Sequence, residues 1–172
     1  MRVILPFVDV VIANEEDAAD VLGIHAEDKD VYSGKLAIDK YPQVAREIVN
    51  QFSNISTVTI TLRESISASH NNWGAMLYDA RSDQAFFAPV RNGEYTPYQI
   101  RNIVDRVGGG DAFGAGLIFA LQTPELSSPE NAVAFATAAS CLAQSILGDF
   151  NYNNREEVEA LMKGSMSGRI VR

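Results

Sequence analysis

The sequence is poor in the residues that build disulfides and zinc sites. It has one cysteine, Cys141, and two histidines, His25 and His70, among 172 residues. A single cysteine cannot form an intramolecular disulfide, and these three residues are too few and too scattered to complete a zinc site. Because alanine, serine and leucine surround Cys141, we expect it to be a small core residue on a buried helix.

Positive charge and long apolar runs are also scarce. The net charge is −8, which disfavours nucleic acid and anionic membranes as partners but leaves room for ATP, whose phosphates backbone N–H groups can bind. The most apolar stretch, residues 131–147, contains Asn, Thr, Ser and Gln and is too short and polar to span a membrane. The first residues, interrupted by Pro6 and Asp9, do not read as a signal peptide. We therefore expect a cytoplasmic protein with one folded domain over residues 1–172.

Strand-like and helix-like segments alternate along the first part of the chain. Runs rich in β-branched residues at 8–13 and 57–62 are typical of buried strands, and helical patterns at 14–23 and 42–52 separate them. This order predicts parallel strands with helical crossovers, and hence an α/β fold. Antiparallel strands or hairpins are expected next, at 65–70, 73–79 and 84–89, with a last strand piece at 103–104. The remaining helices are expected at 112–121, 131–147 and 155–162.

Three glycines and an aspartate precede a fully apolar helical segment: Gly108, Gly109, Gly110 and Asp111. Glycine lets the backbone adopt unusual φ values and approach a ligand closely. At a helix N-terminus the N–H groups of this turn would bind an anion. A carboxylate beside such donors suits phosphoryl transfer, because it can take a proton from a hydroxyl while the donors stabilise the transferring group. The alternative is that Asp111 only caps the helix.

Two other glycine motifs do not fit this segment. A dinucleotide-binding fingerprint requires a glycine where Phe113 stands. A P-loop requires lysine and then serine or threonine after its last glycine, whereas Ala115 and Gly116 follow Gly114. The spacing therefore excludes both motifs.

Residues 105–116 resemble the second signature of PfkB (ribokinase-like) carbohydrate kinases, an Asp-Thr-x-Gly-Ala-Gly-Asp-x-Phe pattern. The sequence departs from it at Arg106, usually threonine, and at Gly109, usually alanine. With arginine at this position, the motif resembles that of the 2-keto-3-deoxygluconate kinase branch of the family. The resemblance implies a three-layer α/β/α ribokinase-like fold, of which this chain is the C-terminal portion, with a mostly parallel sheet and antiparallel strands towards one edge. It also implies ATP and Mg²⁺ as cofactors, with Asp111 as the catalytic base and Gly108 to Gly110 as the anion hole.

The resemblance extends to residues that would hold the metal and the nucleotide. Asn14 and Asp17 match an Asn-x-x-Glu motif that holds hydrated Mg²⁺, with aspartate in place of glutamate. The alternative is a capped, acidic helix start. Thr61 and Arg63 match a Thr-x-Gly segment beside the nucleotide, in which Arg63 replaces the glycine and either reaches a phosphate or is a solvated loop residue.

Two further residues receive roles by the same resemblance. Thr137 falls in a segment that lines the adenine pocket, although its small neighbours are also explained by close helix packing. Asp105 is a candidate for ordering the loop before the glycines, near a monovalent cation such as K⁺.

No segment of the sequence matches the sugar-binding N-terminal half of the family or its first, glycine-rich signature. A sheet that ends at this edge exposes an open strand and apolar helix faces. We therefore expect a homo-oligomer, pairing with a separate N-terminal half, or marginal stability. The leading hypothesis is ATP-dependent phosphorylation of a keto-sugar acid, 2-keto-3-deoxygluconate, to its 6-phosphate. The alternatives are an inactive nucleotide-binding fragment and a kinase of another sugar, a nucleoside or a vitamin.

Overall fold

The computed structural model describes residues 1–14, 16–24 and 38–164 of the chain, so His25 lies outside it. The first part contains a short 3₁₀ helix, a strand and two α-helices: η1 (Leu5–Phe7), β1 (Val10–Asn14), α1 (Asp17–Leu22) and, after η3 (Ile38–Lys40), α2 (Tyr41–Gln51). Six strands follow: β2 (Thr57–Ser67), β3 (His70–Asp79), β4 (Gln84–Ala88), β5 (Val90–Arg91), β6 (Glu94–Tyr95) and β7 (Tyr98–Ile100). The last part is helical, with α3 (Gly109–Gln122), α4 (Pro129–Ala143) and α5 (Arg155–Met162).

The main sheet has the order β1-β2-β3-β4, and β7 also pairs with β3. β1 and β2 are parallel, with Val10 opposite Thr57 and Asn14 opposite Thr61. The other pairs in this sheet are antiparallel, and β2 and β3 form a long hairpin. The α/β class and the antiparallel strands towards one edge are thus confirmed. The share of parallel pairs is smaller than expected. In the described chain β1 and β2 pair in parallel, and the other strand pairs of this sheet are antiparallel.

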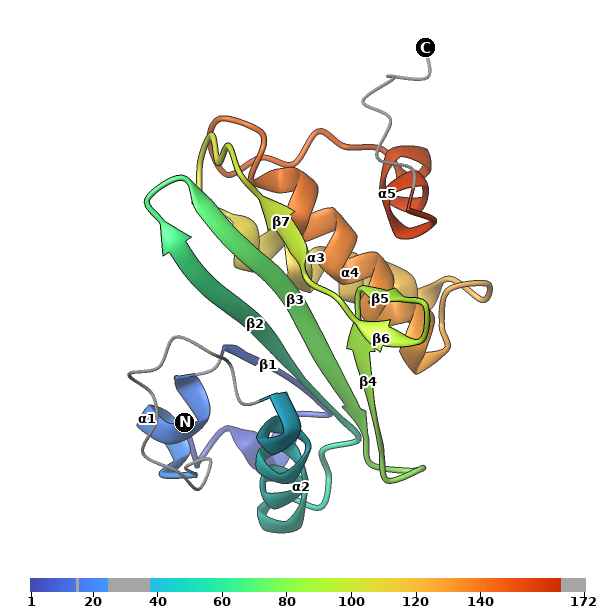
Figure 1. Cartoon of the computed structure of the whole chain (residues 1–172). Coiled ribbons are helices and arrows are strands. Elements are labelled where there is room, and N and C mark those ends of the chain that lie inside the picture. Colours follow the sequence, from blue (N-terminus) through green and yellow to red (C-terminus); the bar gives the residue numbers. More distant parts are fainter. Residues whose placement is uncertain (15, 25–37, 165–172) are drawn as a thin grey trace.

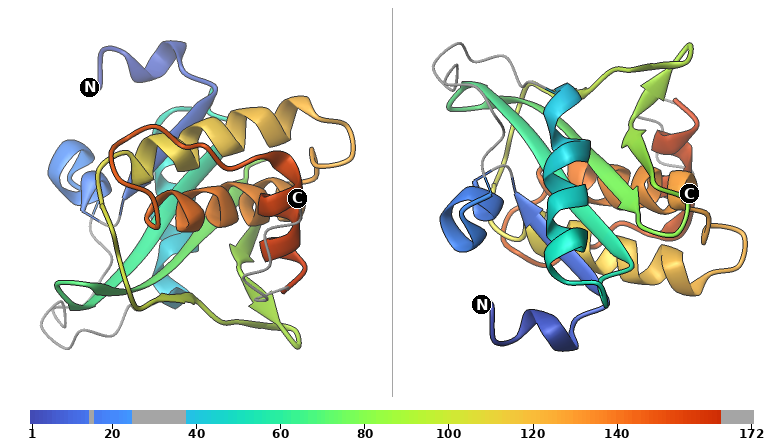
Figure 2. Two further views of the ribbon diagram at one scale, coloured as in Figure 1. Left: turned by 90° about the horizontal axis from the view of Figure 1, so that it is seen from above. Right: turned by 90° about the horizontal axis from the view of Figure 1, so that it is seen from below.

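Helices cover both faces of this sheet, which gives the three expected layers (Figures 1 and 2). Alternate residues of β3 point to opposite faces, as strand geometry requires. Ala75 and Leu77 pack with α3 and α4, whereas Met76 and Tyr78 pack in a second cluster with α2. The sheet therefore lies between two separate hydrophobic cores.

The core beneath α3 depends on small residues. A Cβ atom at Gly116 would lie 3.1 Å from both Ala136 Cα and Ala139 Cβ, so glycine allows α3 and α4 to approach closely. Cys141 lies on α4 and packs against the same core, as expected. Burial raises the pKa of its thiol to about 12, so Cys141 is a packing residue rather than a nucleophile.

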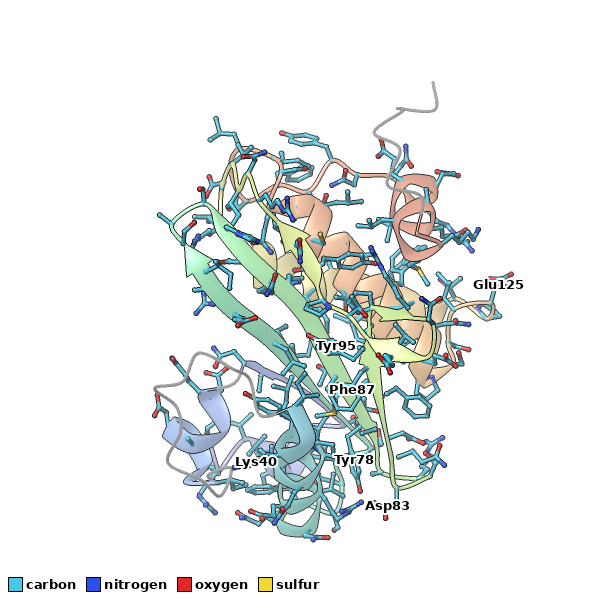
Figure 3. The ribbon with its side chains drawn as sticks, in the orientation of Figure 1. Lys40, Tyr78, Asp83, Phe87, Tyr95 and Glu125 are labelled. Atoms are coloured by element: carbon cyan, nitrogen blue, oxygen red, sulfur yellow. The ribbon has the colours of Figure 1, made fainter. Side chains whose placement is uncertain are left out.

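Several elements differ from the sequence-based expectation. Residues 103–104 do not form a strand, because Ile103 N–H donates to Ser69 O and Val104 N–H to Gln144 O. The small β5–β6 ribbon was not expected. It folds back so that the Tyr95 ring lies against Gly74 and 5.9 Å, centroid to centroid, from the ring of Phe87 (Figure 3). The ribbon is a tight hairpin, with Val90 opposite Tyr95 and Arg91 opposite Glu94. Asn92 and Gly93 form its turn with positive φ angles, so the Asn-Gly pair was the local signal that could have predicted it.

Candidate functional site

The glycine turn leads directly into α3. Gly108 is the N-cap residue and has a left-handed backbone, with φ +76° and ψ −1°. A Cβ atom at this position would lie 2.8 Å from both Cα and O of Asp149. Glycine is therefore required at position 108 for two reasons: its φ is positive, and the backbone of Asp149 approaches too closely for a side chain.

Asp111 lies in the first turn of α3, and its side chain is exposed. Because Gly108 is the N-cap and no side chain caps this helix, the alternative that Asp111 is only a helix cap is wrong. The first turn of a helix leaves N–H groups without helical partners, and the helix dipole adds positive potential there. Asp111 thus places a carboxylate beside the first N–H groups of α3, of which Gly109 N–H donates to Arg106 O at 3.4 Å. Anion binding at this turn stays a prediction.

Two side chains hydrogen-bond to the backbone of the turn and of the segment before it. Ser140, fully buried on α4, donates its hydroxyl to Gly109 O at 2.7 Å. Asp105 accepts the Val107 N–H on Oδ1 and the Gly148 N–H on Oδ2, each at 3.0 Å. These backbone hydrogen bonds, that from Val107 first, hold the pKa of Asp105 below its usual value. Asp105 therefore links the segment just before the turn to the loop that follows α4, which orders the loop before the glycines.

Asn14 and Asp17 are close together at the start of α1. Asn14 Oδ1 accepts the Asp17 N–H at 2.9 Å, and Asp17 Oδ2 accepts the Asn14 N–H at 2.8 Å. This reciprocal pair is a capping box, with aspartate in the position of the usual glutamate. The structure therefore contains the capped helix start that was the alternative interpretation, and the metal role of these residues stays a prediction.

The first half of α3 packs against the last residues of β1. A Cβ atom at Gly114 would lie 3.6 Å from Ile12 Cδ1, which brings the first half of α3 over β1. Asn14 follows on the same strand, opposite Thr61 of β2. Asn14 thus ends the strand on which α3 packs, and α/β proteins commonly place ligand sites beyond the C-terminal ends of such strands.

The other predicted site residues occupy different environments. Thr61 is buried, and its hydroxyl donates to Ala13 O at 3.5 Å, so it joins β1 to β2. Arg63 is exposed two residues further along β2. Thr137 is fully buried in α4, where its hydroxyl donates to Val133 O at 2.6 Å. Its position favours the helix-packing interpretation over an adenine contact.

Sequence reasoning missed how the loop before the turn is held. The side chain of Arg106 reaches the tip of the β2–β3 hairpin, where Nη2 donates to Ala68 O at 2.7 Å and to Ser67 O at 3.1 Å. Ser140 was missed as well. The arginine at position 106, where the family has threonine, was the one sequence signal for the contact with the hairpin. No local signal marked the hydrogen bond from Ser140 to Gly109 O.

Comparison with solved structures identifies the fold. The chain resembles a 2-dehydro-3-deoxygluconokinase from Thermotoga maritima, with a TM-score of 0.80 and 40% identity over 95% of this chain and 44% of that chain. It also resembles a PfkB family carbohydrate kinase from Listeria grayi, with a TM-score of 0.73 and 29% identity over 94% of this chain and 43% of that chain. The chain has the fold of PfkB carbohydrate kinases. It spans less than half the length of these two kinases.

A more distant structure of similar fold was solved with a nucleotide. A ribokinase II from E. coli in complex with ATP and Mg²⁺ has a TM-score of 0.59 and 17% identity over 94% of this chain and 41% of that chain, which supports the fold alone. No protein-family model matches the sequence, and no curated protein matches it significantly.

Across residues 1–14, 16–24 and 38–164, no helix is long and apolar enough to cross a bilayer. Within the same ranges, no group of three or more His, Cys, Asp or Glu side chains could enclose a metal ion.

The hydrogen bonds of Asp105 predict an acid-sensitive turn. Because its pKa is lowered in the folded state, its stabilising contribution is present above the usual carboxyl pKa and is lost as pH falls through the folded-state value. We expect Asp105→Asn to lower stability at pH 7 and to lose less additional stability than the unaltered chain on acidification. Urea midpoints at pH 7 and pH 3 measure both effects. The exposed Asp9→Asn is the matched control, and equal acid sensitivity of all three proteins would contradict the prediction.

Proposed function

We propose that this chain forms the ATP-binding and catalytic part of a PfkB carbohydrate kinase, corresponding to the C-terminal half of the fold. The observation that carries the proposal is the turn from Gly108 to Asp111, where a left-handed glycine starts α3 and leaves an exposed carboxylate in its first turn. The resemblance to the two carbohydrate kinases supports the same reaction class.

In the proposed reaction Asp111 takes a proton from the acceptor hydroxyl. The hydroxyl oxygen then bonds to the γ-phosphorus of ATP while the bond from that phosphorus to the β,γ-bridging oxygen breaks, which releases ADP. The N–H groups of Gly108, Gly110 and Asp111 would hold the oxygens of the transferring group, and that of Gly109 would join them only by giving up its bond to Arg106 O, which is 3.4 Å long. Backbone donors suit this role because they are fixed in place before the charge develops.

Mg²⁺ fits beside Asn14 and Asp17 only through water. The Oδ1 atom of Asn14 already accepts N–H groups from Glu16 and Asp17, and Asp17 commits Oδ2 to the capping box. The remaining Oδ1 of Asp17 would hold a hydrated ion, which neutralises phosphate charge when bound. Asp105 enters the proposal as an ordering residue, because a K⁺ ion there would have to share oxygens that already accept backbone N–H groups.

The proposed substrate is a keto-sugar acid, 2-keto-3-deoxygluconate, phosphorylated at its 6-hydroxyl. The 40% identity to the Thermotoga maritima enzyme supports this choice over another sugar, a nucleoside or a vitamin. A second candidate is a nucleotide-binding fragment without turnover. It is favoured by the coverage of 44% of that enzyme, because the acceptor must be positioned for phosphoryl transfer and much of the kinase has no counterpart here.

The open edge of the sheet supports a partner for this chain. β1 is the edge strand on the side of the sheet opposite β4, and its Val10 and Ile12 are 36% and 42% exposed. Ile118, on the outer side of α3, is 60% exposed. An apolar edge strand is a template for a further strand. We infer that this edge receives the rest of the kinase fold, which makes up more than half of the Thermotoga maritima chain.

Replacing Asp111 tests the catalytic proposal. ATP·Mg²⁺ is titrated into the chain by calorimetry, and phosphorylation of 2-keto-3-deoxygluconate is then measured with and without the unmatched N-terminal segment of the Thermotoga maritima enzyme, supplied by co-expression. We expect turnover only with that segment, and Asp111→Asn should lower it by about 10²–10⁴-fold while ATP affinity changes little.

Glu130→Gln is the control for this substitution, because Glu130 also lies in the first turn of a helix, α4. Turnover near normal in Asp111→Asn would show that Asp111 is not the base. ATP binding without turnover, even with the added segment, would support the fragment candidate. A chain that does not bind ATP would contradict both candidates.

The edge of β1 gives a separate prediction. A lysine at an edge position opposes addition of a strand, so Val10→Lys should abolish co-purification with the same Thermotoga maritima segment. Ile66→Lys is the matched control, because Ile66 is 51% exposed on the hairpin, away from β1. Co-purification is measured after size-exclusion chromatography. Equal recovery of both variants, or a dimer of this chain through β1 in place of the complex, would overturn the assignment of this edge.

A further inference from the structure

The tip of the β2–β3 hairpin has little packing of its own. β1 pairs with β2 only as far as Thr61, and β2 continues to Ser67 beyond that point. Residues 65–69 are all exposed, and the pairing has an irregularity between Ser65 and Ser67. Segments with few buried contacts open easily, so the position of this tip depends on the hydrogen bonds that it makes to the rest of the molecule.

Those hydrogen bonds come from the segment before the glycine turn. Ile103 N–H donates to Ser69 O at 3.1 Å. Arg106 Nη2 donates to Ala68 O at 2.7 Å and to Ser67 O at 3.1 Å, and Asn71 Oδ1 lies 3.4 Å from the same nitrogen. Consecutive carbonyl groups of the hairpin tip are thus all bonded to residues 103–106, two of them by a single guanidinium.

The same segment is bonded on its other side to the end of α4. Val104 N–H and Asp105 N–H donate to Gln144 O at 2.9 and 3.4 Å. Asp105 also holds Gly148. Without Arg106, the Ile103 bond would be the one remaining backbone link from this segment to the hairpin tip in the described chain. Arg106 stands two residues before Gly108, so a change in its position reaches the turn directly.

We propose that Arg106 is a positioning residue that fixes the glycine turn relative to the β2–β3 hairpin. Its function rests on the proposed ATP site, because the residues assigned to nucleotide binding are divided between these two elements: Thr61 and Arg63 on β2, and Gly108 to Asp111 at α3. A guanidinium suits the task because it is always charged, and hydrogen bonds from a charged donor to a carbonyl are stronger than neutral ones.

Three arginine variants test this role by amide hydrogen exchange and by ATP·Mg²⁺ titration. Arg106→Ala should accelerate exchange at residues 66–70 and 107–111 and weaken ATP affinity about tenfold, the effect expected for one lost hydrogen bond to a charged group. Arg106→Lys should restore part of both losses, because its ammonium keeps the charge on a shorter arm. Arg101→Ala is the control, since the Arg101 side chain donates to Gln99 Oε1 at 2.7 Å, and among the described residues it has no hydrogen bond to the hairpin tip.

The two readouts separate failure of this inference from failure of the proposed function. If the unaltered chain does not bind ATP, the proposed function fails, and exchange at the two segments still decides the role of Arg106. Exchange and affinity in Arg106→Ala equal to those in Arg101→Ala would overturn the inference. Faster exchange throughout the chain, with no preference for the two segments, would also overturn it, because it would show general destabilisation.

Discussion

The left-handed backbone of Gly108, packed against Asp149, is the constraint on which the candidate site depends. A side chain here would meet the Asp149 backbone at 2.8 Å and would disfavour the φ of +76°. This conformation turns the chain from the 103–107 segment into α3. It thereby sets where the first N–H groups of the helix and the carboxylate of Asp111 lie.

The core beneath the site keeps that turn in place. Gly116 lets α3 and α4 approach within contact of their backbones, and the close approach allows the buried hydroxyl of Ser140 to reach Gly109 O. On the outer side, Asp105 and Arg106 tie the turn to the loop at Gly148 and to the β2–β3 hairpin. Packing and polar contacts thus act on the same few residues, so a loss of packing between the helices would also disturb the backbone of the glycine turn.

Local signals in the sequence predicted the features of the site that involve residues a few positions apart in the chain. The glycines before an apolar run indicated a helix N-terminus with an adjacent carboxylate, and Asn14 indicated a helix cap. Contacts between distant segments could not be predicted, because periodicity contains no information on which loops meet. Arg106 reaches a hairpin tip more than 35 residues away in sequence, and residues 103–104 bond to α4 and the hairpin instead of forming a strand. Thr137 is buried because it lies on the face of α4 that packs on the core. The sequence did not show which face this is, because small residues surround Thr137 on every side.

The central claim is that the N–H groups of the glycine turn bind the phosphates of ATP. Backbone amide chemical shifts of the ¹⁵N-labelled chain, followed by NMR during titration with ATP·Mg²⁺, test it most directly. The account predicts saturable shifts that are largest across residues 108–111 and small along α5. Shifts absent from this turn, or centred on another surface, would contradict it.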